Sequence, residues 1–265
     1  MAKQTHHVVP YRSRLPGVEA FSLLSERAFP RHAHDHYGIG VLTAGAQKSW
    51  SGVGAVESAA GDVIMVNPGE MHDGAPIGGA RGWHIVYLDP ELIARELAGE
   101  PGGDAVFRPV AHDRHLAGDI MRWLAALRDP ALDAAAEELL LACLARVVGR
   151  HCLSGGRRPG RSPPIVRAVE WIEAAPEADT PLAELAASCD LSRFQLIRGF
   201  MRDVGTTPHA YRLQLRVRLA RRHLAEGQAV ADAALLAGFA DQSHLTRAFV
   251  RQFGITPGRY RAMLG

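Results

Sequence analysis

Three closely spaced histidines are the residues whose types and spacing most directly suggest chemistry in this chain. The stretch RHAHDHYGIG places His32, His34 and His36 two residues apart. Because alternate residues of a β-strand point to one face, a strand here predicts that the three rings converge. Imidazole binds Zn, Fe, Ni and Cu, so the pattern fits an enzyme's metal site, a sensor's binding pocket or a polar strand without chemistry.

The region around these histidines has the pattern of a β-rich domain. Glycine and proline recur at short intervals before about residue 88, and between them lie short runs such as IGVLTAG, GDVIMVNP and WHIVYL. Short strands with frequent turns are typical of a β-barrel or a β-sandwich. From Asp113 to Arg150 apolar residues follow helical spacing, which predicts a pair of antiparallel helices.

The apolar face of this helix pair needs a surface to pack on. We expect that surface to be the β-domain, a second copy of the chain, or both, and a homodimer is the expected assembly. The residues expected to form the dimer contact are Leu116, Ile120, Trp123, Leu127, Leu139, Leu140 and Leu144.

Charge divides the chain into two parts. The 265 residues carry a net charge of +2, but residues 1–153 hold 14 Lys and Arg against 18 Asp and Glu, whereas residues 154–265 hold 16 against 10. The segment LSGGRRPGRSPP is typical of a linker. We therefore predict a first domain at 1–153, a linker at 154–164 and a basic second domain at 165–265 that meets an anionic partner.

Other features narrow the class of protein. No apolar run approaches the roughly 20 residues that span a bilayer, which argues against a membrane protein. The segment MAKQTHHVVPYRSR lacks the apolar core of a secretory signal, so we expect the protein in the cytoplasm. Cys143, Cys152 and Cys189 form no C-x-x-C pair, which favours idle thiols over a disulfide framework or a Cys-rich zinc site.

An internal repeat in the second domain is the most specific pattern in the chain. RGFMRDVGTTPHAYR begins at Arg198 and RAFVRQFGITPGRYR at Arg247, and the two coincide at eight positions with an offset of 49 residues. Each follows a short amphipathic helix and a brief turn in which Ser192 or Asp241 is placed to cap the next helix. Helix, short turn and helix is the helix-turn-helix plan, and the domain is expected to hold about seven helices.

The two units, the arginine-rich helix between them and the terminal FGITPGRYR resemble the DNA-binding domain of AraC/XylS-type transcription regulators. The resemblance covers residues 165–265. It implies double-stranded promoter DNA as a partner, and RNA polymerase as a further one. Together with helix geometry it indicates the following DNA-binding residues: Arg193, Phe194, Ile197, Arg198, Gln242, Ser243, Thr246 and Arg247.

The expected roles of these and the neighbouring arginines differ. Arginine can bind guanine O6 and N7 with two hydrogen bonds, and Gln242 can pair with adenine in the same manner. Arg193 is expected to contact phosphate, as half to two-thirds of protein–DNA hydrogen bonds do. Arg202 and Arg251 are expected to have structural or backbone roles. A solvated face is the expectation for Arg216, Arg218, Arg221 and Arg222.

The first domain resembles the cupin-type β-barrel that many AraC/XylS-type regulators use to sense small molecules. RHAHDHYGIGVLTAG is similar to the first cupin motif and GDVIMVNPGEMHDG to the second. In metal-binding cupins, two histidines and a glutamate of the first motif join a histidine of the second. Here YGIG stands where that glutamate is expected, so His36 or a residue of the second motif must replace it. The metal ligands that follow are His32, His34, His72 and Glu70.

An organic effector is the competing occupant of the barrel, held by hydrogen bonds inside an apolar cavity. The residues expected to contact it are His32, His34, His36, Tyr37, Trp50, Glu70 and His72. A third interpretation gives the histidines only a structural role, in which they satisfy buried backbone groups. Trp83 and Tyr87 are interpreted as core residues.

These expectations combine into an α+β, two-domain protein. A cupin-like β-barrel with a following helix pair precedes an all-α domain with two helix-turn-helix units. The expected function is an effector-responsive, sequence-specific transcription regulator, an activator or a repressor, whose cofactor is either absent or a divalent transition metal ion. The rival is a metal-dependent cupin enzyme of the dioxygenase or isomerase type with an accessory DNA-binding domain. The two helix-turn-helix units and the missing glutamate argue against that enzyme.

Overall fold

The structure is a computed structural model that describes residues 5–11, 13, 15–97, 106–129, 132–153 and 161–264. The chain divides into two compact units, Met1–Phe29 with Ala33–Gly156, and Arg157–Gly265 with Pro30–His32. Strand β3, which contains Pro30–His32, pairs with β7, so we describe it with the β-sheet. Of the linker predicted at 154–164, residues 154–160 lie outside the described residues.

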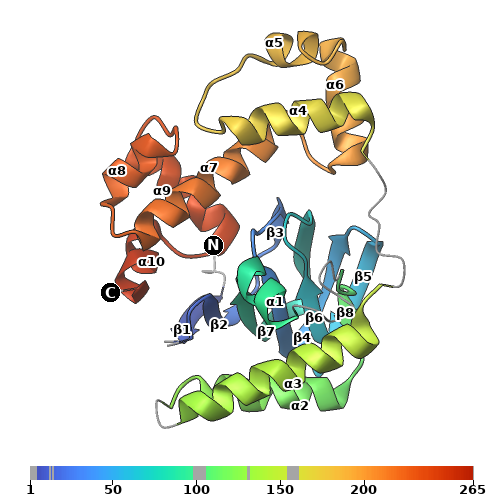
Figure 1. The fold of residues 1–265 in the computed structure, drawn as a ribbon, viewed down its shortest axis with the longest axis vertical. Helices are drawn as coiled ribbons and strands as arrows, with labels where there is room; N and C mark the ends of the chain where they lie inside the picture. Colours follow the sequence, from blue (N-terminus) through green and yellow to red (C-terminus); the bar gives the residue numbers. More distant parts are fainter. Residues whose placement is uncertain are drawn as a thin grey trace. The chain divides into compact units, whose positions relative to one another are not determined.

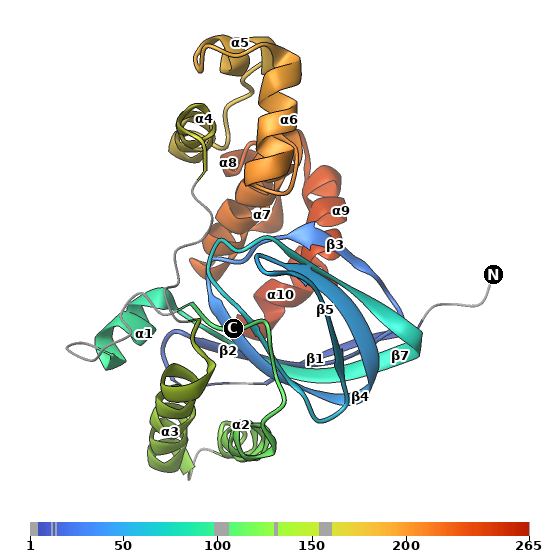
Figure 2. The same ribbon diagram turned by 90° about the vertical axis from the view of Figure 1, so that its right-hand side faces the viewer.

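An eight-stranded sheet forms the first unit (Figure 1). Its strands are β1 (His6–Tyr11), β2 (Val18–Ser25), β3 (Phe29–His32), β4 (Tyr37–Ser51), β5 (Gly54–Ala59), β6 (Val63–Val66), β7 (His72–Leu88) and β8 (Val110–Ala111). The order β1-β2-β7-β4-β6-β8 is antiparallel throughout, while β3 pairs with β7 and β5 with β4. The long central strands β4 and β7 curl, and the sheet curls with them (Figure 2). This confirms the expected β-domain.

Side-chain alternation along β7 gives the sheet two different faces. Val86 and Leu88 point to one face and join a large apolar core. Trp83, Ile85 and Tyr87 occupy the alternate positions and therefore point to the other face. The helices of this unit are α1 (Pro90–Glu96), α2 (Arg114–Ala126) and α3 (Asp133–His151). Helices α2 and α3 lie together along the first of these faces (Figures 1 and 2).

The apolar faces of α2 and α3 pack against the sheet of the same chain. Buried or partly buried in the core with the sheet are Leu116, Ile120, Trp123, Leu127, Leu139, Leu140 and Leu144. The expectation that the helices pack on the β-domain is confirmed, and the expectation that these residues form a dimer contact is wrong. An apolar helix face of this width is covered by one partner surface, and here the sheet covers it. A dimer would have to use other residues.

The second unit consists of helices in all the residues that the structure describes. They are α4 (Pro163–Ala174), α5 (Leu182–Ala187), α6 (Arg193–Asp203), α7 (Pro208–Ala225), α8 (Val230–Leu236), α9 (Gln242–Phe253) and α10 (Pro257–Leu264). The pairs α5–α6 and α8–α9 are the two helix-turn-helix units, and α7 connects them. The seven helices agree with the number that the sequence predicts.

Local sequence signals set the ends of the two recognition helices. The Ser192 Oγ accepts a hydrogen bond from the Gln195 N–H, and the Gln195 side chain accepts one from the Ser192 N–H, which makes a capping box. The Asp241 carboxylate accepts a hydrogen bond from the His244 N–H at 2.7 Å. Both predicted caps are therefore confirmed. Gly254, with φ of 75°, ends α9 in the left-handed conformation that glycine adopts without strain.

Two arginines of α7 are structural. Arg216 is buried and donates hydrogen bonds to the carbonyl oxygens of Pro176 and Glu177 and to Asp179 Oδ1 at 2.7–2.9 Å. Arg221 lies five residues further along the helix, where its Nε donates to the Tyr260 hydroxyl at 3.0 Å. The expectation of a solvated face is wrong for these two residues. Arg216 satisfies carbonyl groups of a loop that have no helical partners, whereas Arg221 links α7 to α10.

Gly238, in the turn between α8 and α9, predicts a large effect on stability. Its φ is +77°, and an added Cβ would lie 2.5 Å from the carbonyl oxygen of Glu177. We expect Gly238→Ala to lower the free energy of unfolding by about 1–3 kcal/mol, because backbone strain and a steric collision add. Denaturant unfolding of the full chain, followed by circular dichroism at 222 nm, measures the change.

Two other glycines provide controls for that substitution. Gly227 also has a left-handed φ, of +89°, but its Cβ would meet open space. Gly227→Ala should therefore show only the backbone strain. Gly258 has neither constraint and lies in α10, so Gly258→Ala should not lower the free energy of unfolding. If Gly238→Ala were no worse than Gly227→Ala, the close approach to Glu177 would have no energetic weight.

Candidate metal centre and nucleic-acid interface

The histidine-rich stretch is a strand end followed by a bend. Strand β3 ends at His32, residues 33–36 are not extended strand, and β4 begins at Tyr37. The expectation that one strand aligns all three histidines is therefore wrong. His34 and His36 both lie past the end of the strand, where two-residue alternation no longer assigns a direction, and of these two only His34 belongs to the group of side chains that converge.

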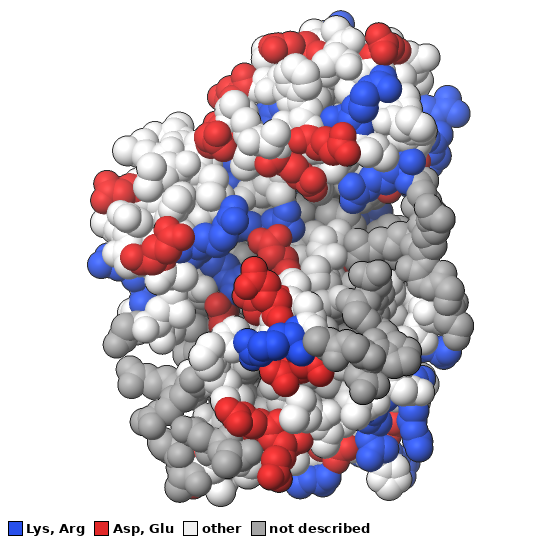
Figure 3. Space-filling view, viewed as in Figure 1, with Lys and Arg blue, Asp and Glu red and all other residues white. Residues whose placement is uncertain are grey.

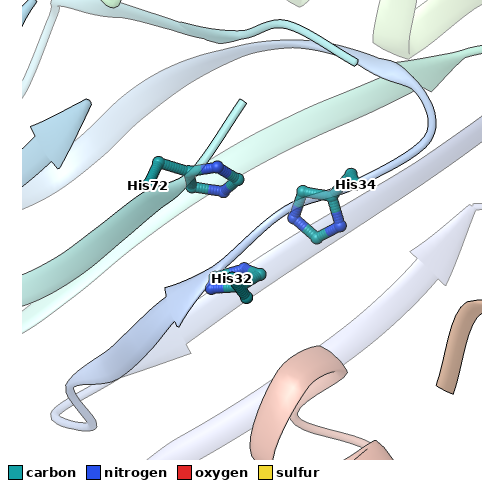
Figure 4. A group of neighbouring side chains, drawn as sticks. All are labelled: His32, His34 and His72. Atoms are coloured by element: carbon teal, nitrogen blue, oxygen red, sulfur yellow. The ribbon is translucent and has the colours of Figure 1, made fainter. Parts of the chain in front are cut away.

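A distant residue completes the group that converges. His32, His34 and His72 each offer a ring nitrogen, and these nitrogens all lie within 4.8 Å of one another (Figure 4). His72 is the first residue of β7, which pairs with β3 and so returns beside it. The centroids of the His34 and His72 rings are 5.0 Å apart. His32 and His34 are buried, and His72 is half-buried.

Hydrogen bonds to backbone carbonyl groups indicate the tautomer of two of the rings. His32 Nδ1 lies 2.7 Å from the Pro30 carbonyl oxygen, and His72 Nδ1 lies 3.0 Å from the Glu70 carbonyl oxygen. A carbonyl oxygen can only accept, so Nδ1 carries the proton in both rings and Nε2 keeps its lone pair. Metal-binding histidines are usually oriented in this way. Burial lowers the pKa of His72, which favours the neutral ring that a metal needs.

The donor set fits a transition metal. At metal–nitrogen distances of about 2.0–2.1 Å, tetrahedral ligand nitrogens are about 3.3 Å apart, so small rotations of the three rings would suffice. Three imidazoles without a thiolate or carboxylate suit Zn²⁺, Ni²⁺, Cu²⁺ or Fe²⁺ and disfavour Mg²⁺ and Ca²⁺. Three protein ligands also leave a tetrahedral position open for water or for an effector atom.

Glu70 does not belong to the group that converges. Its Oε1 accepts a hydrogen bond from the Gly52 N–H at 2.9 Å, and its Oε2 accepts from Asn67 Nδ2 at 2.6 Å and the Asn67 N–H at 3.2 Å. Both oxygens therefore hold turns together. The prediction of Glu70 as a metal ligand is wrong because β7 begins only at His72, so strand alternation does not extend back to Glu70.

This role of Glu70 can be tested separately from metal binding. Glu70→Gln replaces one acceptor by an NH₂ group that faces a backbone or amide donor, which should cost about 1–3 kcal/mol of unfolding free energy. Binding of added Zn²⁺, measured by calorimetry on the folded variant, should equal that of the unsubstituted chain. Glu57→Gln, at an exposed position of β5, is the control. Loss of zinc from folded Glu70→Gln would restore Glu70 as a ligand.

Tyr87 lies where the sequence lacks the expected glutamate. Gly38 is opposite Tyr87 in the β4–β7 register, and a Cβ at Gly38 would lie 3.3 Å from the Tyr87 ring. The Tyr87 ring lies 5.0 Å from the His34 ring, with its hydroxyl 3.5 Å from His34 Nε2. Interpreting Tyr87 only as core missed this contact. The signal was available in β7, where Tyr87 alternates with the apolar core residues Val86 and Leu88.

The remaining predicted effector contacts lie elsewhere. The Tyr37 ring packs on Phe107, with centroids 4.8 Å apart, beside the core that faces the helices. Tyr37 alternates with Gly38 on β4 and so points to the face opposite His34, and effector binding by Tyr37 stays a prediction. Trp50 is near the end of β4, where its backbone N–H donates to Asp73 Oδ1 at 2.7 Å. Effector binding by Trp50 and His36 stays a prediction.

The predicted DNA-contacting side chains lie on the outer faces of α6 and α9. The buried residues of α6 are Leu196, Gly199 and Phe200, and those of α9 are Leu245, Ala248, Phe249 and Gln252. Exposed or half-exposed on the remaining faces are Arg193, Phe194, Ile197, Arg198, Gln242, Ser243, Thr246 and Arg247. This placement leaves all eight accessible. Their contacts with bases or phosphates stay predictions.

Charge on the face drawn in Figure 3 is mixed. Basic and acidic side chains alternate over the surface without forming one large basic area. The described residues of this face therefore form no uniformly positive surface that would attract DNA. Recognition of DNA is expected to depend on particular arginines of the two recognition helices.

Known families match both parts of the chain. Residues 17–144 match the AraC-like ligand binding domain, and residues 185–263 match a helix-turn-helix domain family. The chain belongs to the AraC family of transcriptional regulators. This confirms the resemblance that both halves of the sequence carry, and with it the expected class of function. Relatives of this AraC-type regulator carry the names of transcriptional regulators, which agrees with the same class.

Individual relatives share the two-part plan to different extents. The HTH-type transcriptional regulator YbfI of Bacillus subtilis strain 168, itself uncharacterized, is 26% identical over 225 residues, which are 82% of this chain and 81% of YbfI. The transcriptional activator NphR of a Rhodococcus species is 38% identical over 86 residues, which are 32% of this chain and only 25% of NphR.

Solved structures support the fold of the AraC-type regulator. Apo ToxT K231A from Vibrio cholerae strain SCE256 has a TM-score of 0.58 at 11% identity, over 96% of this chain and all of ToxT. ToxT with an unsaturated fatty acid bound has a TM-score of 0.58 at 12% identity, over 100% of this chain and 98% of that one. Among the described helices, none is both long and apolar enough to cross a membrane.

Proposed function

We propose that this AraC-type regulator responds to a divalent transition metal ion, with Zn²⁺ as the first candidate, held by His32, His34 and His72. The observation that supports this most is the convergence of three largely buried imidazoles. Two of them have Nδ1 beside a carbonyl oxygen, which is the hydrogen bond that commonly orients a metal-binding imidazole.

The ion would act by preferring one conformation of the regulator. A ligand shifts an equilibrium only by its difference in affinity for two states, so the metal must bind more tightly to one of them. It would supply a fixed positive charge on the sheet and an open coordination position. We expect the regulator to act on promoter DNA in the cytoplasm as a homodimer, with RNA polymerase as a partner, in keeping with its family.

An organic acid is the second candidate effector, and Arg81 favours it. This guanidinium is only 1% exposed, and it donates to three neutral acceptors, Gln47 Oε1 and the carbonyl oxygens of Arg27 and Gly74. No carboxylate among the described residues pairs with Arg81, and burial lowers its pKa to about 10. An anionic effector would supply the missing counter-charge.

The proposal is tested on the full chain, purified without a chelator or a histidine tag. Elemental analysis should find about one transition metal ion per chain. Dialysis against a chelator and readdition of Zn²⁺ should then change the dissociation constant for a fragment of the regulator's own promoter by about 5–150-fold, the usual range of coupling between two sites. Absence of bound metal, together with no calorimetric Zn²⁺ binding, would overturn the metal proposal and leave the organic acid. A fatty acid such as oleic acid is then the probe, with Arg81→Met as the variant.

A further inference from the structure

The outer face of α6 carries apolar side chains, and the DNA group that they would contact has not been named so far. Phe194 is 72% exposed and Met201 is 47% exposed, and the half-buried Ile197 lies between them. Residues three, four and seven positions apart share one face of a helix, so these three side chains line up beside Arg198. We call Phe194, Ile197 and Met201 the apolar stripe.

The apolar stripe lies away from the face that holds α6 in its unit. Leu196, Gly199 and Phe200 are buried on that inner face. A Cβ at Gly199 would lie 2.8 Å from Ile165 Cδ1 of α4, so the packing there is already tight. Phe194 and Met201 therefore add nothing to the core, and their contact with water is unfavourable until a partner covers them.

The equivalent face of α9 is more polar. At the offset of 49 residues, Phe194, Ile197, Arg198 and Met201 correspond to Ser243, Thr246, Arg247 and Val250. The Thr246 hydroxyl donates to the Gln242 carbonyl oxygen at 2.8 Å, within the helix. Both helices thus present an arginine at the same position, but only α6 surrounds that arginine with large apolar side chains.

We propose that α6 recognises thymine methyl groups through its apolar stripe, next to a guanine bound by Arg198, whereas α9 reads its half-site mainly through hydrogen bonds. Thymine is the base that presents a methyl group in the major groove, and apolar side chains recognise it there. Phe194 and Ile197 are the second and fifth residues of α6, in the N-terminal part that a helix-turn-helix brings to base edges.

Charge on α6 supports DNA as the partner that covers the stripe. Arg193, Arg198 and Arg202 are exposed on the same helix as the stripe. The apolar stripe, with arginines on either side, suits the major groove of DNA, whose floor carries thymine methyl groups and whose edges carry phosphates. The inference rests on DNA binding by the two recognition helices and is independent of the metal proposed for the β-sheet.

Removal of single methyl groups from DNA tests the inference. The full chain first selects its site from duplexes with a randomised segment. Each thymine of the selected site is then replaced in turn by deoxyuridine, which lacks the methyl group and keeps the hydrogen-bonding edge. Fluorescence anisotropy at constant salt should show at least one position where the dissociation constant rises about fourfold, the effect of uncovering one methyl-sized group.

A comparison of variants assigns that effect to α6. In Phe194→Ala, replacing the sensitive thymine by deoxyuridine should no longer change the dissociation constant. In Ser243→Ala, the equivalent position of α9, the fourfold effect should remain. Both side chains are exposed, so the fold should be unaffected, which thermal unfolding verifies. A selected site without thymine, deoxyuridine without effect at every position, or an unchanged effect in Phe194→Ala would each overturn the inference. Retained selective binding in those cases would leave DNA recognition itself intact.

Discussion

Replacing His32 and His72 together by alanine is expected to abolish stoichiometric metal binding by this AraC-type regulator. Mutation of groups that merely orient a ligand costs about 10–100-fold in metal affinity, so loss of two of the three ligands should exceed 100-fold. Calorimetric titration of the folded variant with Zn²⁺ measures this loss. The promoter fragment should still bind, because the residues that face DNA lie on α6 and α9, but its affinity should no longer respond to Zn²⁺.

A matched substitution separates loss of ligands from general damage. His115→Ala removes an exposed imidazole from α2, outside the group that converges, and should leave both metal binding and the Zn²⁺ response unchanged. Thermal unfolding without metal identifies variants that fail to fold. If the double variant bound Zn²⁺ with unchanged affinity, or kept the response, His32 and His72 would not form the sensor site.

Replacing Arg198 or Arg247 by alanine is expected to weaken binding to the specific DNA site by about 1–3 kcal/mol, or about 5–150-fold in the dissociation constant. Both side chains are exposed at equivalent positions of the two recognition helices. A bidentate contact with guanine is lost only on the correct sequence, so binding to random DNA should fall much less. Fluorescence anisotropy with the selected site and with a scrambled duplex, at the same salt concentration, gives the two losses.

Arg193→Ala provides the comparison for a phosphate contact. Arg193 is the first residue of α6 and is expected to meet the DNA backbone, so its loss should weaken specific and random binding alike. It should also reduce the slope of log affinity against log salt by about one. If Arg198→Ala or Arg247→Ala showed this same uniform loss, that arginine would contact phosphate and carry no sequence information.

Much of the helical unit follows from local sequence. The repeat at an offset of 49 residues, the caps at Ser192 and Asp241 and the left-handed glycines are short-range signals. Each one depends on the few residues around it, because a helix forms its hydrogen bonds within four residues of chain. Sequence therefore predicted both helix-turn-helix units, the number of helices, and the faces of α6 and α9 that are left exposed.

The histidine site shows what sequence alone determined and what it did not. Two histidines of the first motif and one of the second were predicted from sequence, and the structure brings these three together. Sequence could not decide that β3 ends at His32, so that alternation no longer places His34 and His36, or that β7 starts at His72, two residues after Glu70. Alternation assigns faces only within a strand, and the ends of strands depend on pairing with distant segments.

Tertiary structure alone decided which surfaces meet. The register between β4 and β7 places Tyr87 opposite Gly38 and beside His34, a contact between residues 53 positions apart in the chain. The apolar faces of α2 and α3 could pack equally well on a sheet or on a second copy of the chain. In the structure they pack on the available face of the sheet. Burial of apolar area is non-directional, so the sequence determines that such a face is covered, and only the fold determines by what.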